Sequence, residues 1–133
     1  MGELPRESNQ LVEQQVYSRI GADGFERLCR AFYARVANDD ILGSMYPEKD
    51  LAKAEARLRE FLVFRFGGPD DYIQHRGHPR LRLRHASFAI DQSARDRWMQ
   101  LMNQSLDEVQ LPADVRAVLV GLFEHVATFL INR

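Results

Sequence analysis

A helix stop at Gly67-Gly68-Pro69, followed by a long basic loop, limits the folds open to this chain. Glycine allows unusual torsions and proline lacks a backbone N–H donor, so the three residues together end a helix. From Tyr72 to Ala86 no helical spacing is visible, and residues 80–84 alternate Arg and Leu like a half-buried strand without a partner strand. We therefore expect a loop with a short helical turn. An insert of roughly fifteen residues is uncommon in a compact domain unless it has a function.

Outside this loop, apolar residues recur at the three- and four-residue spacing of amphipathic helices. Capping residues, prolines and glycines mark where each helix begins or ends. The expected helices are 10–20 (ended by Gly21), 23–37 (capped by Asp23), 50–66 (capped by Asp50), 91–109 (opened by Asp91) and 112–130 (opened by Pro112). Residues before Gln10 are expected to be frayed, and a tight corner over 41–47 holds Tyr46. The pattern predicts an all-α fold.

Composition and charge exclude several classes of function. The 133 residues fit one domain, and a formal net charge of -1 provides no basic field for nucleic acid. The single cysteine, Cys29, rules out an internal disulfide and is expected to be buried, which fits a reducing cytoplasm. No window approaches the roughly 18 apolar residues of a membrane span, and the polar start is unlike a signal peptide. We expect one soluble, cytoplasmic domain over 16–133, preceded by a partly disordered extension over 1–15.

His85, at the end of the basic loop, is the candidate metal ligand. Imidazole is the commonest protein ligand of transition metals, and an axial bond to haem iron needs only one histidine. A flat apolar cofactor between the third expected helix and the loop would supply the packing contacts that the loop lacks. A zinc site of His75, His78 and His85 is the alternative, but Pro79 and the uneven spacing do not match structural zinc ligands.

Several separated motifs of the chain agree with one known pattern. They are Phe32-Tyr33, Tyr46-Pro47, Gly67-Gly68-Pro69 with Tyr72, Arg76-Gly77-His78-Pro79, Leu81, Arg84-His85, and Asp96 with Trp98. Together they resemble the truncated haemoglobins of the second group, the bacterial haemoglobin O-like branch, over about Tyr17 to Asn132. The resemblance is specific because anchors far apart in the sequence agree at once, the tryptophan included.

This resemblance implies a globin-like, two-over-two helical sandwich, the truncated-globin fold, that holds haem b. It makes His85 the proximal iron ligand, and on the distal, ligand-binding side it places Tyr33, Tyr46, Trp98, Ala54 and Leu58. The chain departs from the family in three respects: Gly21-Ala22 stands where Gly-Gly is common, Phe66 replaces a frequent tryptophan, and residues 1–15 are additional. These departures concern helix packing and the first turn rather than the cofactor.

Haem also carries two propionates, which cationic or phenolic side chains at a pocket rim usually bind. The candidate partners are Arg57, Tyr72, His78 and Arg84, and the expected apolar cofactor contacts are Phe61, Leu62, Phe88 and Met102. Arg57 precedes Leu58 and therefore points aside from the apolar face of its helix, as a rim residue should. Arg80 and Arg82 are expected to be exposed.

Two phenols and an indole can donate hydrogen bonds to a bound diatomic ligand. An indole N–H only donates, whereas a phenol donates or accepts, so Trp98 and Tyr46 are the natural direct donors and Tyr33 a relay. Which phenol contacts the ligand stays open at this point. Without the resemblance, Tyr33 and Trp98 would be interpreted as core residues with a satisfied polar tip.

The leading hypothesis is a haem protein that binds or transports oxygen and binds other diatomic ligands. The alternative is a haem enzyme, either a nitric oxide dioxygenase or a peroxidase-like enzyme, with a reductase as partner. A third hypothesis is a haem-free helical interaction module. A homodimer stays open, because Phe123, Val126, Phe129 and Leu130 of the last helix suit both a core and an interface. His125, on a face with Val118, Leu122 and Phe129, is expected in the core or at a dimer contact.

Overall fold

The computed structural model describes the backbone of residues 6–46, 51–68 and 90–132, with side chains from residue 13 onward. Its elements are α1 (Arg6–Ala37), the 3-10 helix η1 (Gly43–Met45), α2 (Leu51–Arg65), α5 (Gln92–Val109) and α6 (Ala113–Phe129). Within these ranges there is no strand, which confirms the all-α prediction. None of the described helices combines the length and the apolarity that crossing a membrane requires.

α1 consists of two helical parts that meet at Gly21. This glycine has φ 66° and ψ 177°, a conformation that is essentially restricted to glycine, so the predicted break is confirmed. Helix begins at Arg6, however, so the prediction that residues 6–9 are frayed is wrong. Residues 6–20 are rich in Glu, Gln and Arg, which favour a longer helix. Residues 1–5 lie outside the described part.

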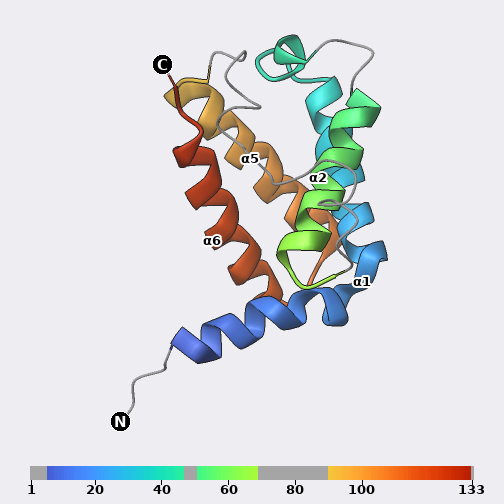
Figure 1. The fold of residues 1–133 in the computed structure, drawn as a ribbon. Helices are drawn as coiled ribbons and strands as arrows, with labels where there is room; N and C mark the ends of the chain where they lie inside the picture. Colours follow the sequence, from blue (N-terminus) through green and yellow to red (C-terminus); the bar gives the residue numbers. More distant parts are fainter. Residues whose placement is uncertain (1–5, 47–50, 69–89, 133) are drawn as a thin grey trace.

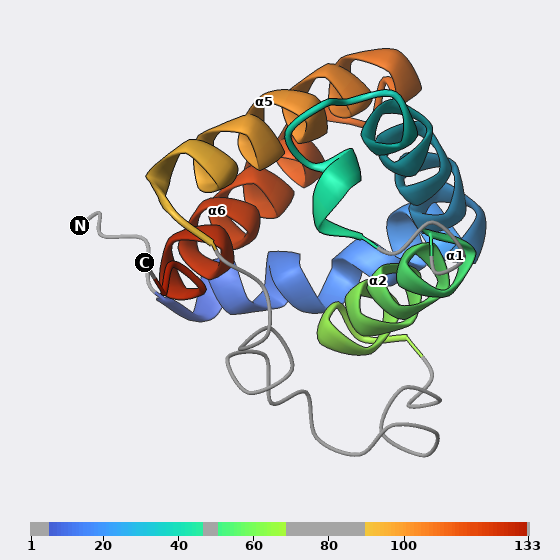
Figure 2. The same cartoon turned by 90° about the horizontal axis from the view of Figure 1, so that it is seen from above.

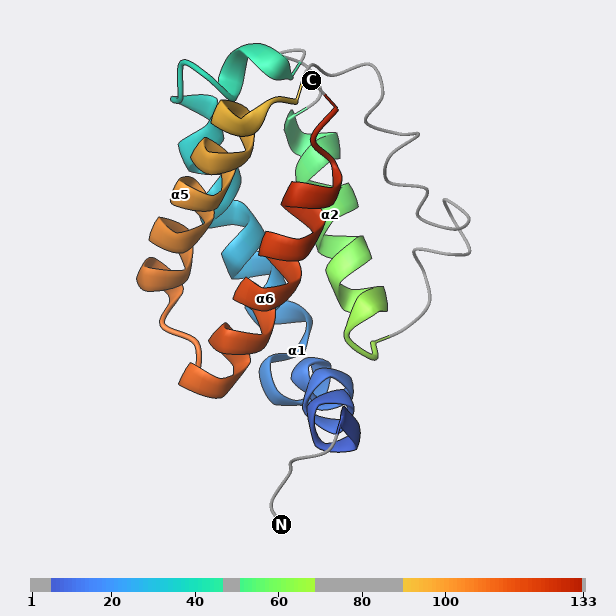
Figure 3. The ribbon, with the colours of Figure 1, turned by 90° about the vertical axis from the view of Figure 1, so that its left-hand side faces the viewer.

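The helices form two antiparallel pairs (Figures 1 and 2). Residues 22–37 of α1 pack against α2, and α5 packs against α6; α1 also has an extensive contact with α5, which joins the pairs. The first part of α1 crosses below the ends of α2 and α6 in Figure 1, and Figure 3 shows it end-on. Arg19 pairs there with Asp114 of α6, and Arg65 of α2 donates to Glu13 at 3.0 Å. The crossing segment therefore ties the two pairs together at one end.

Local signals account for most helix ends. Asp91 caps α5 through its carboxylate, which accepts a hydrogen bond from the Ala94 N–H at 2.8 Å, and Pro112 is the N-cap of α6. After α2, Gly67 has φ 93°, and a Cβ built on it would lie 2.7 Å from the backbone oxygen of Gln14. Glycine is required there both by torsion and by space, so the predicted stop after α2 is confirmed.

A single core runs between the two pairs. Its largest fully buried side chains are Phe25, Phe32, Phe66, Leu28, Leu62, Met102, Leu106 and Leu119. Cys29 is buried as predicted, and Phe66 stacks on Phe25 with ring centroids 6.0 Å apart, so a phenylalanine fills this position well. The prediction for His125 is wrong where it placed this residue in the core, because His125 is exposed on α6.

Candidate functional site

The structure brings the three predicted hydrogen-bond donors into one aromatic cluster, formed by Tyr46, Tyr33, Phe32, Trp98 and Phe123. Ring centroids lie 5.8 Å apart for Tyr46 and Tyr33, 5.0 Å for Tyr33 and Phe32, 4.8 Å for Phe32 and Trp98, and 5.4 Å for Trp98 and Phe123. The rings come from the corner after α1, from α1 itself, from α5 and from α6. Residues far apart in the sequence thus form a continuous row of rings.

Neighbouring positions on α1 make this row possible. Successive residues of an α-helix differ by about 100° in direction, so Phe32 reaches Trp98 of α5 while Tyr33 reaches Tyr46 of the corner. Tyr33 is 8% exposed. Tyr46 directly follows η1 in an extended conformation, with φ -107° and ψ 133°, and packs against the core. The predicted corner around Tyr46 is therefore confirmed.

Burial keeps both phenols protonated. It raises the pKa of Tyr33 well above its usual value, and the interaction with Tyr46 raises that pKa further. The pKa of Tyr46 is also raised by burial, although its hydrogen bond with Tyr33 acts in the opposite direction. The two phenols therefore share a hydrogen bond. The charge of Arg57 lowers both pKa values, which places this guanidinium within electrostatic reach of the two phenols.

The predicted site residues on α2 differ in how far their side chains are exposed. Arg57 is exposed, as expected for a rim residue, whereas Ala54 is buried. Leu58 and Phe61 are partly buried and pack at the edge of the core. Leu62, like Met102 of α5, is fully buried within the core. The partly exposed pair, Leu58 and Phe61, offers apolar surface at the edge of the core.

Several predicted site residues lie outside the described part of the chain. They are the proposed axial ligand His85 and the cofactor contacts Tyr72, His78, Arg84 and Phe88, together with His75, Arg80 and Arg82. Among the residues that are described, no three His, Cys, Asp or Glu side chains are grouped so that they could hold a metal ion. The described residues therefore form one side of a candidate site.

The chemistry of this side fits haem. A flat apolar group could pack on the partly exposed Leu58 and Phe61, and the aromatic cluster would present O–H and N–H donors to a small ligand. Arg57 provides a cation at an exposed position near the phenols, suited to a carboxylate.

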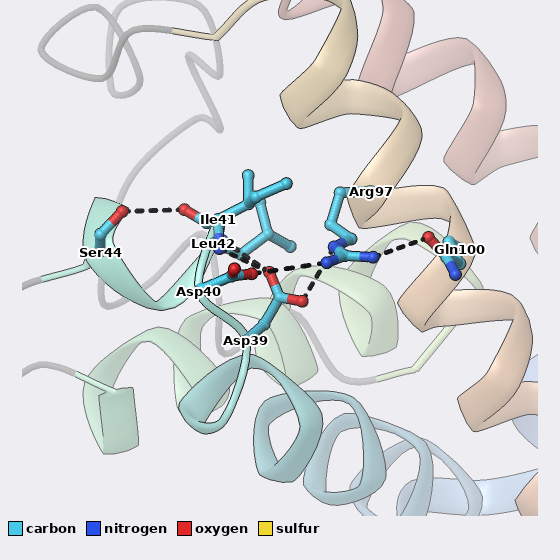
Figure 4. Close-up of polar contacts among 7 residues, drawn as sticks. All are labelled: Asp39, Asp40, Ile41, Leu42, Ser44, Arg97 and Gln100. Carbon is cyan, nitrogen blue, oxygen red and sulfur yellow. Dashed lines mark hydrogen bonds and ion pairs between the residues drawn. The ribbon is translucent and has the colours of Figure 1, made fainter.

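Sequence reasoning missed two residues next to this cluster, Asp39 and Arg97. The carboxylate of Asp39 accepts hydrogen bonds from the backbone N–H groups of Ile41 and Leu42 and pairs with Arg97 (Figure 4). An aspartate that is followed within three residues by apolar residues at a helix end is a signal for such a turn. No pattern in the sequence indicates that Arg97 of α5 pairs with Asp39.

The chain is similar to known proteins over most of its length. A family model of bacterial-like globins matches residues 15–132. The group 2 truncated haemoglobin of Bacillus subtilis is 34% identical over 117 residues, covering 88% of each chain. Among solved structures, a thermostable haemoglobin from Thermobifida fusca has a TM-score of 0.84 at 43% identity, covering 88% of this chain and 96% of its own. A truncated oxygen-avid haemoglobin from Bacillus subtilis has a TM-score of 0.83 at 34% identity, covering 88% and 98%.

Proposed function

Because this chain belongs to the bacterial-like globin family, as a group 2 truncated haemoglobin, we propose that it holds haem b and binds oxygen and other diatomic ligands. The two antiparallel helix pairs are the two-over-two sandwich of these globins. A relative of known structure is described as oxygen-avid, which supports oxygen as a ligand. The observation that carries the proposal is the aromatic cluster, which gathers two phenols and an indole from three separate elements.

Each donor has a separate role in this proposal. Haem, when bound, supplies an iron atom with a coordination position for a diatomic ligand. In the hydrogen bond that the two phenols share, we assign the donor role to Tyr33, since a phenol that accepts through its oxygen can still donate its own proton. This favours Tyr46 and Trp98 as the residues that donate to the ligand and Tyr33 as the residue that orients Tyr46. The high pKa of both phenols keeps these protons in place at neutral and mildly alkaline pH.

His85 completes the proposal as the axial ligand on the other side of the haem. Its neighbours Arg84 and Phe88, with Tyr72 and His78, stay the proposed contacts of the cofactor in that segment. Arg57 is the proposed propionate partner on the described side, since it is exposed beside the phenols. Leu58 and Phe61 would pack on the porphyrin, and their partial exposure supports this role.

Haem reconstitution tests the cofactor and its ligand. The purified protein with added haem should give a Soret band, and extraction into alkaline pyridine should identify haem b. His85→Ala should lose the iron–histidine stretching band in the ferrous form, and added imidazole should restore axial ligation. His125→Ala is the matched control because His125 is exposed on α6. A parent protein that binds no haem would rule out the proposal.

Oxygen dissociation, measured by stopped flow, tests the roles of the donors. A hydrogen bond to a charged or strongly polarised group contributes roughly 1.5–3 kcal/mol, so Trp98→Phe and Tyr46→Phe should each speed oxygen release about tenfold or more. Tyr33→Phe should have a smaller effect, because it removes only the hydrogen bond that orients Tyr46. If Tyr33→Phe speeds release and Tyr46→Phe does not, the two tyrosines have the opposite roles.

A further inference from the structure

The corner that carries Tyr46 is organised by one carboxylate. Asp39, whose side chain is only 8% exposed, accepts through Oδ2 from the backbone N–H groups of Ile41 at 3.1 Å and Leu42 at 2.8 Å. Its backbone oxygen also accepts from the N–H of Gly43 at 2.9 Å. These three contacts fix the chain from the end of α1 to the start of η1, and Tyr46 directly follows η1.

The same carboxylate connects this corner to α5. Oδ1 of Asp39 lies 2.9 Å from Nε of Arg97, a buried atom, in an ion pair that Figure 4 shows. Arg97 is the residue before Trp98, so the ion pair attaches the corner to α5 directly next to Trp98. Its other contacts, to Gln100 at 3.1 Å and Asp40 at 3.5 Å, lie at the surface.

Tyr46 and Trp98 are therefore linked by two routes. One is the row of rings through Tyr33 and Phe32, and the other is the ion pair between Asp39 and Arg97. Rings in contact can slide and tilt at little cost, whereas an ion pair at a buried nitrogen is little screened by water, so pulling its two charged groups apart costs more. The ion pair is thus the contact that can fix the corner relative to α5.

We propose that Asp39, through Arg97, is a positioning residue that fixes the separation between the hydroxyl of Tyr46 and the indole N–H of Trp98. The inference rests on the proposed function only in that these two groups donate to one ligand. Two donors converge on a small ligand only if their spacing is held, since displacements of about 1 Å can change rates strongly. The geometry itself can be measured without any ligand.

The test compares Asp39→Asn, Arg97→Gln and the double variant, with Asp40→Asn as the matched control. Asparagine can still accept from Ile41 and Leu42 but loses the charge that faces Arg97, and the Asp40 side chain is 89% exposed. Trp98 is the only tryptophan, so its indole N–H gives one cross-peak in a ¹⁵N-labelled sample, in the carbon monoxide form or without haem. Oxygen dissociation from the haem-loaded protein is the second measurement.

The proposal expects Asp39→Asn and Arg97→Gln to shift the indole cross-peak and to speed oxygen release about threefold or more. The double variant should do no more than either single variant, because each removes the same contact. Asp40→Asn should match the parent. A fall in melting temperature with an unchanged cross-peak and release rate means that the pair is merely structural and overturns the proposal, as do effects that add in the double variant.

The outcomes separate this inference from the proposed function. If the parent binds no haem, the proposed function fails, whereas the cross-peak of the haem-free protein still decides whether Asp39 and Arg97 position Trp98. If haem and oxygen bind normally and the variants behave like the parent, only the positioning role fails. Should Asp39→Asn not fold, Arg97→Gln decides the question alone, because it leaves the contacts of Asp39 with Ile41 and Leu42 in place.

Discussion

The thiol of Cys29 lies on the buried face of α1, and its surroundings change its chemistry. The pKa of Cys29 is raised to about 12, mainly by burial and also by the charge of Glu55, while the charge of Arg59 acts in the opposite direction. A thiol that stays protonated is a poor nucleophile and a poor metal ligand. This agrees with the prediction from the sequence that Cys29 is buried.

The shifted pKa of Cys29 predicts a pH dependence of stability. An exposed thiol ionises near pH 8.5, whereas the folded thiol keeps its proton to about 12, so the unfolded state loses its proton first. The contribution of the buried, protonated thiol to the free energy of unfolding is therefore fully present below about pH 8.5 and is lost as pH rises toward 12. The free-energy difference between the parent and Cys29→Ala should shrink by about 1–2 kcal/mol between pH 8 and pH 10. Urea unfolding at both pH values measures it, and a constant difference would contradict the prediction.

The hydrogen-bond donors of the candidate site could be predicted from the sequence only in part. Tyr33 and Trp98 were recognisable in the sequence, but helical spacing alone assigned both to the core. Tyr33 is in fact buried in the core cluster, and it also contacts Tyr46. The two interpretations are compatible, because an aromatic side chain can pack by its ring and donate by its polar tip.

At the scale of elements, the break in α1 decides how the first helical part crosses the others. Gly21 has a backbone conformation that other residues adopt only with strain, and a Cβ there would meet no atom within 4 Å. The requirement for glycine is therefore purely torsional. Because the break turns the chain, Arg19 can reach Asp114 and Glu13 can reach Arg65.

Replacing glycine by alanine should have opposite effects on stability at Gly21 and at Gly121. Gly21→Ala should lower the free energy of unfolding by about 1–3 kcal/mol, since alanine is strained at this torsion. Gly121→Ala, in the exposed middle of α6 with no atom near its Cβ, should raise it by about 0.5–1 kcal/mol. Chemical denaturation followed by circular dichroism measures both. Equal effects would mean that Gly21 is an ordinary helix residue.

Element boundaries were largely predictable, since the signals are local. Asp91, Pro112 and Gly67 act within a few residues of themselves, and each helix end lies where it was expected. The start of α1 was placed too late because its weak apolar spacing concealed a run of good helix formers.

At the scale of the whole molecule, α6 supports the candidate site although none of its residues was predicted there. Phe123 contacts the ring of Trp98 at 5.4 Å and is 3% exposed, whereas Phe129, on the same helix, is 49% exposed. The sequence could not assign these two phenylalanines to core or surface. Their different environments follow from the contact of α6 with α5 and α1.

Truncating the side chains of Phe123 and Phe129 should show that the first lies in the core and the second at the surface. Phe123→Ala removes a buried ring and should lower the free energy of unfolding by about 3–5 kcal/mol. Phe129→Ala should change it by less than about 1 kcal/mol. Urea unfolding of both variants provides the values, and Trp98 fluorescence should change only in Phe123→Ala. A comparable loss of stability in both variants would show that Phe129 is covered in solution.

The sequence by itself determined the helices, their caps, the break at Gly21 and the family, because each depends on torsions and short-range capping or on motifs that can be matched directly. The tertiary structure decided which faces meet: the contact of Phe32 with Trp98, the separation of Phe123 from Phe129, and the pairing of Asp39 with Arg97. Such contacts join residues far apart in the chain. Their geometry depends on how whole helices pack, and a local pattern does not encode it.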